Sequence, residues 1–385
     1  MTCRRRFGIE LLALLLAAWA LGGCVGAPIT PSGPCQAHTT HPREAEYQAL
    51  LSAHCVRGQA PGCAMVVARD GEPTWMGGVG LASPTTGAPM CAETLFRVAS
   101  VSKLYVAALI LRLVELNRLE LTDTLAVLLP EVSEGIPGSE RITVEHLLAH
   151  RSGLSSPDTA DLGLQIDFID RPSELAGLSL RERLARYVYR RPLEFEPGTG
   201  FRYSNTGYDL LGLIAERIEG ESLQAALAHH FFDALELDQT SFELGNDPSI
   251  AHGHALTSEG WLLDVTVLDR ANVGDESPSG GLITTAEELT VFLSALFGGR
   301  LISQASLDLM RRADCIDPNV CDRGYGLGFE WDARASPTAV GHSGNLVGVT
   351  ARAYHFEETD TLVILLRNVK HAGALDMPFL RSVAD

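Results

Sequence analysis

Residues 100–119 read SVSKLYVAALILRLVELNRL, and this stretch says most about the fold. From Leu104 onward apolar residues cover nearly every side of a helix, which is typical of a helix buried within a protein. Ser100 and Lys103 lie three residues apart at its start, so both side chains share one helix face. We therefore expect a buried helix whose first turn brings a hydroxyl and an amine together.

Strand patterns lie towards the two ends of the chain, and helical patterns lie between them. Residues 64–69 and 74–81 flank Asp70-Gly71, a strong hairpin signal, and a helix is predicted before them at 44–54. Further strands are predicted at 326–331, 349–356 and 361–367, and further helices at 144–150, 180–189, 208–218, 223–235 and 286–296.

This order favours an α/β (α+β) fold with one antiparallel sheet flanked by helices. We expect the sheet part at residues 43–98 and 283–385, built from both chain ends, and an inserted all-helical part at residues 99–282.

Composition excludes several classes of protein. The chain has 385 residues, of which 46% are hydrophobic and 20% charged, as in an ordinary globular protein, so disorder, collagen and coiled coil are excluded. The formal net charge is −18, and such a surface repels a phosphate backbone. We therefore expect no nucleic-acid partner.

The N-terminus has the features of an export signal. Three arginines precede a short apolar run, which ends in Leu21-Gly22-Gly23-Cys24 and resembles a bacterial lipobox. We predict a signal peptide at residues 1–23, a lipid on Cys24, a tether at residues 24–42 and a catalytic domain at residues 43–385. A plain secretory peptide cut a few residues later is the alternative, and a membrane helix is disfavoured because the run is too short.

These features place the protein in the cell envelope on the periplasmic side, held to a membrane only by its lipid. The residues after Cys24 are Val25-Gly26, without the Asp associated with inner-membrane retention, so we favour the outer membrane. The sequence does not determine the oligomeric state.

Export permits disulfides, and six cysteines remain beyond Cys24. Cys315 and Cys321 can close a small loop. We favour Cys35–Cys55 and Cys63–Cys91 for the rest, although six cysteines allow about 15 pairings. A zinc site is the competing use, but no Cys-x-x-Cys spacing occurs.

Lys103 is unusual because this chain has 28 Arg and only two Lys. Arginine keeps its proton in proteins, whereas a lysine can lose it and act as a base. Ser100-x-x-Lys103 can therefore supply a nucleophile with its base. The alternative is a surface lysine following a helix cap.

Two further motifs follow in order. Tyr203-Ser204-Asn205 offers a phenol and an amide before another helix, although it could be a simple helix cap. His342-Ser343-Gly344 precedes the last strands, and His-x-Gly recurs at His371-Ala372-Gly373, so its value lies in its setting.

In this order, the three motifs resemble the penicillin-recognising serine hydrolases, on the side of the class C β-lactamases. The similarity covers roughly residues 43–370. Other landmarks of the family that match are Thr94-Leu95-Phe96-Arg97, the stretch ITVEHLLAHRSGL at 142–154, Pro197-Gly198-Thr199, Ser279-Gly280-Gly281-Leu282 and Tyr325-Gly326-Leu327-Gly328.

The resemblance implies a role for each motif residue. Ser100 would be the acylated nucleophile, Lys103 would help to remove its proton, and Tyr203 would pass that proton to the leaving group. Asn205 would bind the acyl side of the substrate, and the backbone N–H groups of Ser100 and Asn345 would form the oxyanion hole. Ser343 and Gly344 would also line the substrate site.

His342 stands where many members carry the lysine of Lys-Thr-Gly, and the resemblance implies that it belongs to the catalytic set with Ser100, Lys103 and Tyr203. This version looks like D-alanyl-D-alanine carboxypeptidases and related esterases, because a neutral imidazole holds a carboxylate less firmly than an ammonium. We therefore expect a carboxypeptidase-like enzyme or an esterase on small esters, acting on a small-molecule or peptidoglycan-peptide substrate, with β-lactamase as an alternative. A binding lipoprotein that has lost turnover is the rival from another class.

Other candidate sites have simpler explanations. Gly341-x-Ser343-x-Asn345 lacks the final glycine of a hydrolase elbow. His146 and His150 share a helix face at metal spacing, but no catalytic Glu lies between them, so we interpret them as packing or loop-bonding residues. We predict no metal and no cofactor.

Overall fold

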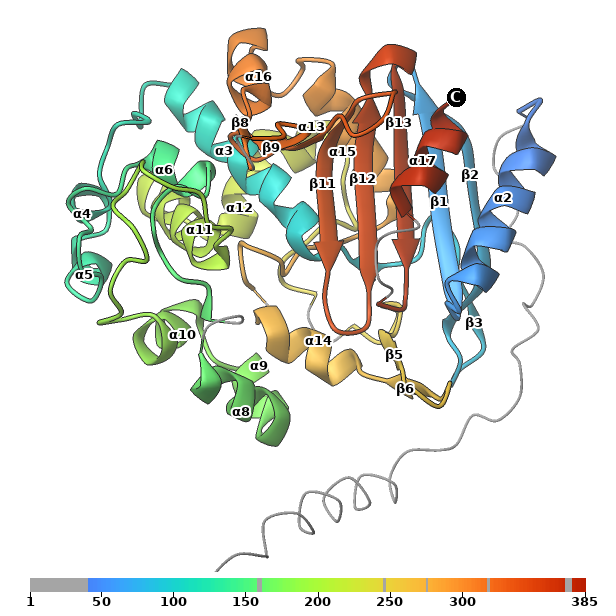
Figure 1. Ribbon diagram of the computed structural model, residues 1–385, viewed down its shortest axis with the longest axis horizontal. Helices are drawn as coiled ribbons and strands as arrows, with labels where there is room; N and C mark the ends of the chain where they lie inside the picture. Colours follow the sequence, from blue (N-terminus) through green and yellow to red (C-terminus); the bar gives the residue numbers. More distant parts are fainter. Residues whose placement is uncertain (1–40, 158–160, 245–246, 275, 317–318, 371–375) are drawn as a thin grey trace, which may run out of the picture.

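The computed structural model describes residues 41–157, 161–244, 247–274, 276–316, 319–370 and 376–385. Its centre is a nine-stranded antiparallel sheet in the order β3-β2-β1-β13-β12-β11-β10-β9-β8 (Figure 1). The strands are β1 (Gly62–Arg69), β2 (Glu72–Ser83), β3 (Ala88–Pro89), β8 (Asp314–Cys315), β9 (Arg323–Tyr325), β10 (Glu330–Asp332), β11 (Ala339–Asn345), β12 (Thr350–Phe356) and β13 (Thr361–Arg367).

The sheet is built from both ends of the chain, as predicted. β1 pairs with β13 from Cys63↔Arg367 to Arg69↔Thr361, so the first and last long strands are neighbours. Both strands are buried along nearly their whole length, because helices cover both faces of the sheet.

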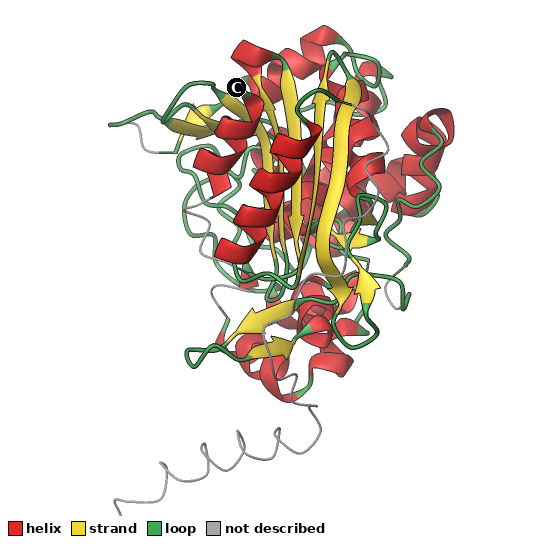
Figure 2. Cartoon of the chain, turned by 90° about the vertical axis from the view of Figure 1, so that its right-hand side faces the viewer, coloured by secondary structure: helices red, strands yellow, loops and turns green. Residues whose placement is uncertain are grey.

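Two helices from the ends of the chain cover one face. α2 (Glu44–Arg57) packs on β1 and β2, and α17 (Asp376–Ala384) packs on β13 and β12, as Figures 1 and 2 show. Their buried side chains Tyr47, Leu51, Leu380 and Val383 pack with Trp75 and with one set of strand residues.

The other face packs against α15 (Ala286–Phe297) and the large core around α3 (Ser102–Glu115). In α3 every residue from Ser102 to Leu111 is buried, which confirms the predicted buried helix.

The region between the two sheet segments is mainly helical and contains η2 (Ala99–Val101), α3, α4 (Leu125–Leu128), α5 (Pro130–Ser133), α6 (Val144–Leu148), α8 (Leu162–Asp170), α9 (Pro172–Ala176), α10 (Leu180–Tyr187), α11 (Asn205–Glu219), α12 (Leu223–Leu227), the π-helical turn η3 (Ala228–Phe232), α13 (Asp233–Leu235) and α14 (Thr266–Val273). The prediction of an all-helical insertion was wrong in one respect. β5 (His254–Leu256) and β6 (Leu262–Asp264) form a hairpin within it.

The predicted strand at 326–331 was also wrong, except for its last two residues, which lie in β10. β9 ends at Tyr325 and β10 begins at Glu330, with a turn between them in which Gly326 N–H donates to the Phe329 carbonyl. Gly328 has a φ of +111°, which favours glycine and interrupts the strand. After α15 and α16 (Gln304–Arg311), β8 and β9 complete the far edge of the sheet.

The disulfides agree with the predictions only in part. Cys315–Cys321 is present, but Cys55 pairs with Cys63, which contradicts both Cys35–Cys55 and Cys63–Cys91. α2 turns straight back into β1, so Cα55 and Cα63 lie 5.9 Å apart, within bonding range. Cys91 is disulfide-bonded as well.

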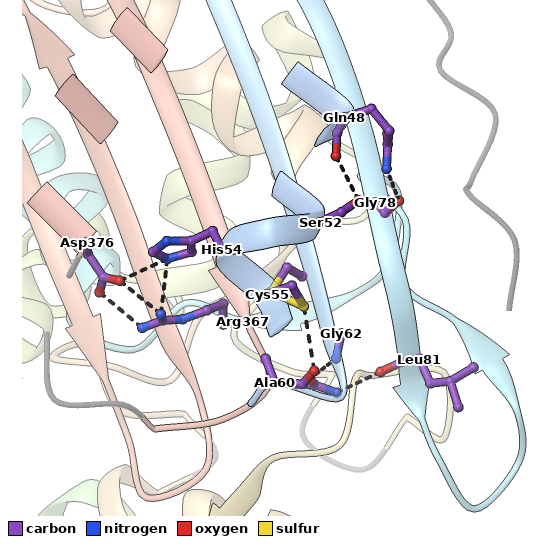
Figure 3. The surroundings of a disulfide bond; sticks show 12 residues. Gln48, Ser52, His54, Cys55, Ala60, Gly62, Gly78, Leu81, Arg367 and Asp376 are labelled. Carbon is purple, nitrogen blue, oxygen red and sulfur yellow. Dashed lines mark hydrogen bonds and ion pairs between the residues drawn. A yellow bond between two sulfur atoms is a disulfide. The ribbon is translucent and has the colours of Figure 1, made fainter. Parts of the chain in front are cut away.

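A buried ion cluster joins the two terminal helices to the sheet (Figure 3). The Asp376 carboxylate on α17 lies 2.9 Å from the Arg367 guanidinium, 3.0 Å from that of Arg352 and 3.2 Å from His54 Nε2 on α2. Burial opposes ionisation of Asp376, but the bond to His54 and the charges of Arg367 and Arg352 outweigh it and lower its pKa. One carboxylate thus compensates two buried guanidinium groups.

Replacing Asp376 with Asn is expected to lower the free energy of unfolding by about 3 kcal/mol or more, because it leaves two buried cations uncompensated. Urea unfolding measures the change. Asp360→Asn, at a side chain that is 68% exposed, is the matched control and should change stability by less than about 1 kcal/mol. Equal small effects in both variants would contradict this account of the cluster.

Within the described ranges, no helix combines the length and the apolar character needed to cross a bilayer. Cys35 lies outside the described residues. The predicted signal peptide, Cys24 and most of the tether also lie outside them, so the predictions of a signal peptide, a lipid and a tether remain untested.

Candidate active site

Ser100 and Lys103 come together at the start of the buried helix, as the sequence predicts. Ser100 lies in η2 and is half-buried, and Lys103 lies in the first turn of α3 and is fully buried. Lys103 Nζ is 3.1 Å from Ser100 Oγ. The residue before the serine, Ala99, has a φ of +52°, an uncommon conformation for alanine, and it is held by the packed structure around it.

Lys103 Nζ also contacts two oxygens from distant parts of the chain. It lies 2.8 Å from Asn205 Oδ1, at the start of α11, and 2.6 Å from the Ser279 carbonyl. Both oxygens accept hydrogen bonds from Nζ. Of the four tetrahedral positions of this nitrogen, one is the bond to Cε, two point to these oxygens and the last faces Ser100 Oγ. In the neutral amine, the lone pair can therefore face the serine hydroxyl, which is the geometry a general base needs.

Ser279 is held in turn by Asp209 of α11. The Asp209 carboxylate accepts a hydrogen bond from the Ser279 N–H at 3.2 Å and one from the Ser277 hydroxyl at 2.7 Å. Burial raises the pKa of Asp209, although these bonds oppose the rise. α11 therefore fixes both acceptors of Lys103, because it carries Asn205 and, through Asp209, holds Ser279.

Tyr203 lies beside the lysine. Lys103 Nζ is 5.0 Å from the centroid of the Tyr203 ring. On the other side, the ring centroid of His150 is 4.2 Å away. His150 Nδ1 accepts a hydrogen bond from the Ser204 N–H at 3.2 Å, so this buried histidine holds the chain beside Tyr203.

The role predicted for His150 and His146, loop bonding, agrees with the structure. His146 Nδ1 accepts from the Thr143 N–H in a capping box at the start of α6. Burial, followed by the charges of Lys103 and His342, holds the pKa of His150 well below 6.5.

β11 approaches the serine closely because residue 344 is glycine. A Cβ on Gly344 would lie 2.2 Å from the Val98 carbonyl oxygen and 3.2 Å from Ala99 Cβ. The end of β11 therefore packs directly against the segment that precedes Ser100. Any larger residue at 344 would push Asn345 away from the serine.

His342 is fully buried and reaches Tyr325 rather than Tyr203. Tyr325 Oη lies 3.0 Å from His342 Nε2, and His342 Nδ1 lies 2.6 Å from the Ser343 carbonyl. Nδ1 therefore carries the proton, and the Tyr325 hydroxyl donates to Nε2. Burial and the charge of Lys103 lower the pKa of His342 despite the opposing effect of Glu330, so the ring is neutral near pH 7.

The side chains predicted to line the substrate site are themselves held by β10 and β12. Ser343 donates to Glu330 through both its N–H, at 3.0 Å, and its hydroxyl, at 2.8 Å, and Tyr354 donates to the same carboxylate. Exposed Asn345 accepts from Arg352 at 3.2 Å. Arg352 also donates to the Gly344 carbonyl, which joins the end of β11 to the buried ion cluster of Asp376.

Several residues of the site escaped prediction. Ser279, His150 and Tyr325 lie in stretches that match landmarks of the family, so the sequence did mark them. Their contacts in the site could not be predicted, because they form only when distant segments fold together. Asp209, Glu330 and Arg352 had no local motif at all. Among the residues that the structure describes, no group of three or more metal-binding side chains occurs.

The family model described as Beta-lactamase matches residues 43–383. The chain belongs to this family. Its membership, together with the paired Ser100 and Lys103, makes it a serine hydrolase with the fold predicted from its sequence.

Relatives of this hydrolase differ in activity. Esterase EstB of Burkholderia gladioli is 39% identical over 170 residues, a match that spans 43% of each chain and so less than half of EstB. Penicillin-binding protein 4 of Amycolatopsis lactamdurans is 28% identical over 332 residues, or 77% of each chain.

Solved structures confirm the fold. A D-stereospecific amidohydrolase from a Streptomyces species superposes with a TM-score of 0.72 at 26% identity, covering 85% of this chain and 94% of its own. Relatives thus include an esterase, a penicillin-binding protein and an amidohydrolase on one fold.

The lowered pKa of His342 predicts a pH-dependent stability. Below pH 6.5 the unfolded imidazole gains a proton that the folded ring does not, so the unfolded state binds more protons and stability falls as the pH falls. His342→Gln should reduce that loss by up to ~1.4 kcal/mol per pH unit.

Urea unfolding of the wild type and the variant at about pH 7.5 and pH 5.5 tests this. The control is His229→Gln, at a side chain that is 72% exposed, and it should keep the wild-type pH dependence. A His342→Gln variant that loses as much stability in acid as the wild type would show that the folded ring titrates normally.

Proposed function

We propose that this protein hydrolyses small carboxylic esters and D-alanyl peptide ends through an acyl-enzyme on Ser100. The observation that carries the proposal is the 3.1 Å contact between Ser100 Oγ and the buried Nζ of Lys103. A hydroxyl beside an amine that is fixed by two other acceptors has a base within reach of its proton. The esterase, penicillin-binding and amidohydrolase relatives support acyl transfer in general.

In the proposed reaction, neutral Lys103 accepts the Ser100 hydroxyl proton while Oγ attacks the substrate carbonyl. The N–H groups of Ser100 and Asn345 donate to the oxyanion, an effect of about 3 kcal/mol per donor in comparable enzymes. Tyr203 gives a proton to the leaving alcohol or amine and recovers it from Lys103. A water molecule then attacks the acyl-enzyme, and the same groups return the serine to its starting state.

The cavity beside the site favours a small acyl group. It has a volume of about 40 Å³ and is bordered by Asn205 and Ser279, the two partners of Lys103, and by Leu184, Val188 and Val273. A cavity of this size holds only a few water-sized groups, at about 10–15 Å³ for each. We therefore expect short acyl groups, such as acetyl and alanyl, to be preferred over long acyl chains.

The state of His342 argues against efficient β-lactamase action. Its ring is neutral, buried and bonded to Tyr325, so it presents no positive charge to a substrate carboxylate. A penicillin, which mimics a D-alanyl end, should therefore acylate Ser100, and the resulting acyl-enzyme should hydrolyse slowly.

Intact-mass spectrometry after brief exposure to a penicillin tests the nucleophile and the substrate class together. We expect an adduct on the wild type and on Ser382→Ala, a control at an exposed serine of α17, and none on Ser100→Ala. For p-nitrophenyl esters, kcat/KM should be about tenfold or more higher for acetate than for octanoate, a difference of ~1.4 kcal/mol.

An adduct on Ser100→Ala would rule out Ser100 as the nucleophile. If the p-nitrophenyl esters survive and no penicillin adduct forms, the proposed hydrolysis is contradicted, and a binding protein that has lost turnover becomes the better account. If octanoate is preferred, the cavity bordered by Asn205 does not receive the acyl group.

A further inference from the structure

A second cavity lies at the opposite end of the sheet from Asn345. In the register of β11 and β12, Asn345 pairs with Thr350 at one end and Ala339 with Phe356 at the other, and the cavity lies at this other end. Its volume is about 490 Å³, within the range of small-molecule sites. It is bordered by the turns that join β1 to β2 and β12 to β13, by the end of α15 and by Arg311 of α16.

Three buried polar atoms border this cavity without a hydrogen-bond partner among the described residues. They are Ser294 Oγ, Arg311 Nε and His355 Nδ1, and Ser294 as a whole is only 7% exposed. Burying an unpaired polar atom costs about 1–3 kcal/mol, so three around one cavity indicate a place where something polar binds.

These atoms present a definite pattern of donors and acceptors. His355 Nε2 lies 2.7 Å from the Asp360 carboxylate, and in the tautomer that donates this bond Nδ1 is an acceptor. Arg311 Nε can only donate, and the Ser294 hydroxyl can do either. The cavity thus offers two donors and an acceptor side by side.

The charges around the cavity are balanced. Arg300 and Arg311 border it, and neither makes an ion pair with a carboxylate in the part of the chain that the structure describes, although the net charge of the protein is −18. Asp70 and Asp360 lie on its rim. A simple anion would gain from the arginines but face the two carboxylates, whereas a molecule with both charges satisfies each side.

The remaining wall is apolar and flat. The Phe297 ring stacks on His355 with centroids 4.8 Å apart, and the Arg311 guanidinium lies 5.8 Å from the centre of the same ring. Ala68 and Leu362 line the strand side. This surface suits a short apolar side chain.

We propose that this cavity is a second, non-catalytic site for a small zwitterion, namely an α-amino acid. Its carboxylate accepts from Arg311, Arg300 and the Ser294 hydroxyl. Its ammonium donates to His355 Nδ1 and to the rim carboxylates of Asp70 and Asp360, and its side chain lies against Phe297. The proposal is independent of the reaction at Ser100, because none of the residues that touch the zwitterion belongs to the catalytic site.

Isothermal titration of the full chain carrying Ser100→Ala tests the site without turnover. D-alanine, L-alanine and glycine are the probes, with acetate and methylamine as the single-charge halves. We expect saturable binding of alanine that is about tenfold or more tighter than that of either half. Arg311→Gln should weaken it about tenfold or more, as loss of a charge-assisted hydrogen bond does.

Arg312→Gln, at the exposed neighbour that does not border the cavity, is the matched control and should bind as the parent does. If Arg311→Gln fails to fold by circular dichroism, Ser294→Ala replaces it, and the expected loss is about threefold or more. The proposal is overturned by the absence of saturable binding of all three amino acids, by acetate binding as tightly as alanine, or by binding that neither cavity variant weakens.

Discussion

Three distant parts of the chain meet at the nitrogen of Lys103. The start of α3 carries the lysine, α11 provides the Asn205 amide, and the loop before β7 (Ile283–Thr284) provides the Ser279 carbonyl. Each contact fixes the nitrogen relative to Ser100, and Asp209 fixes the loop in turn. Burying an amine costs folding free energy, even when two acceptors orient it. A hydroxyl beside it, which it can deprotonate, gives such an amine a function.

The rest of the fold places the end of β11 beside that serine. Gly344 permits the strand to approach the Val98 carbonyl, and Arg352 holds the last residues of the strand from the opposite face. Arg352 is bound by Asp376, which also binds Arg367 and His54. The two helices from the chain ends therefore support the catalytic strand through a buried ion cluster, although both are far from Ser100 in the sequence.

The sequence predicted the parts of this arrangement that have local signals. The buried helix, the hairpin at Asp70-Gly71, the pairing of the chain ends and the proximity of Ser100, Lys103 and Asn205 all follow from periodicity or motifs. What it missed depends on chain reversals and on long-range contacts. The Cys55–Cys63 bond forms because α2 turns back at once, and a turn at Gly328 replaces most of the strand expected at 326–331. Asp209, Glu330 and Arg352 carry no motif because their partners come from distant parts of the chain, a loop for Asp209 and neighbouring strands for Glu330 and Arg352.

The most direct test of the central claim is the acylation rate of Lys103 variants, measured as the burst of p-nitrophenol in rapid mixing with p-nitrophenyl acetate. If Lys103 removes the serine proton, both Lys103→Gln and Lys103→Arg should acylate at least about a hundredfold more slowly than the wild type, since neither side chain can take up the proton. Circular dichroism and unfolding curves verify that each variant is folded. A folded Lys103→Arg variant that acylates within tenfold of the wild type would show that the lysine is only a positive charge, and another group would have to be the base.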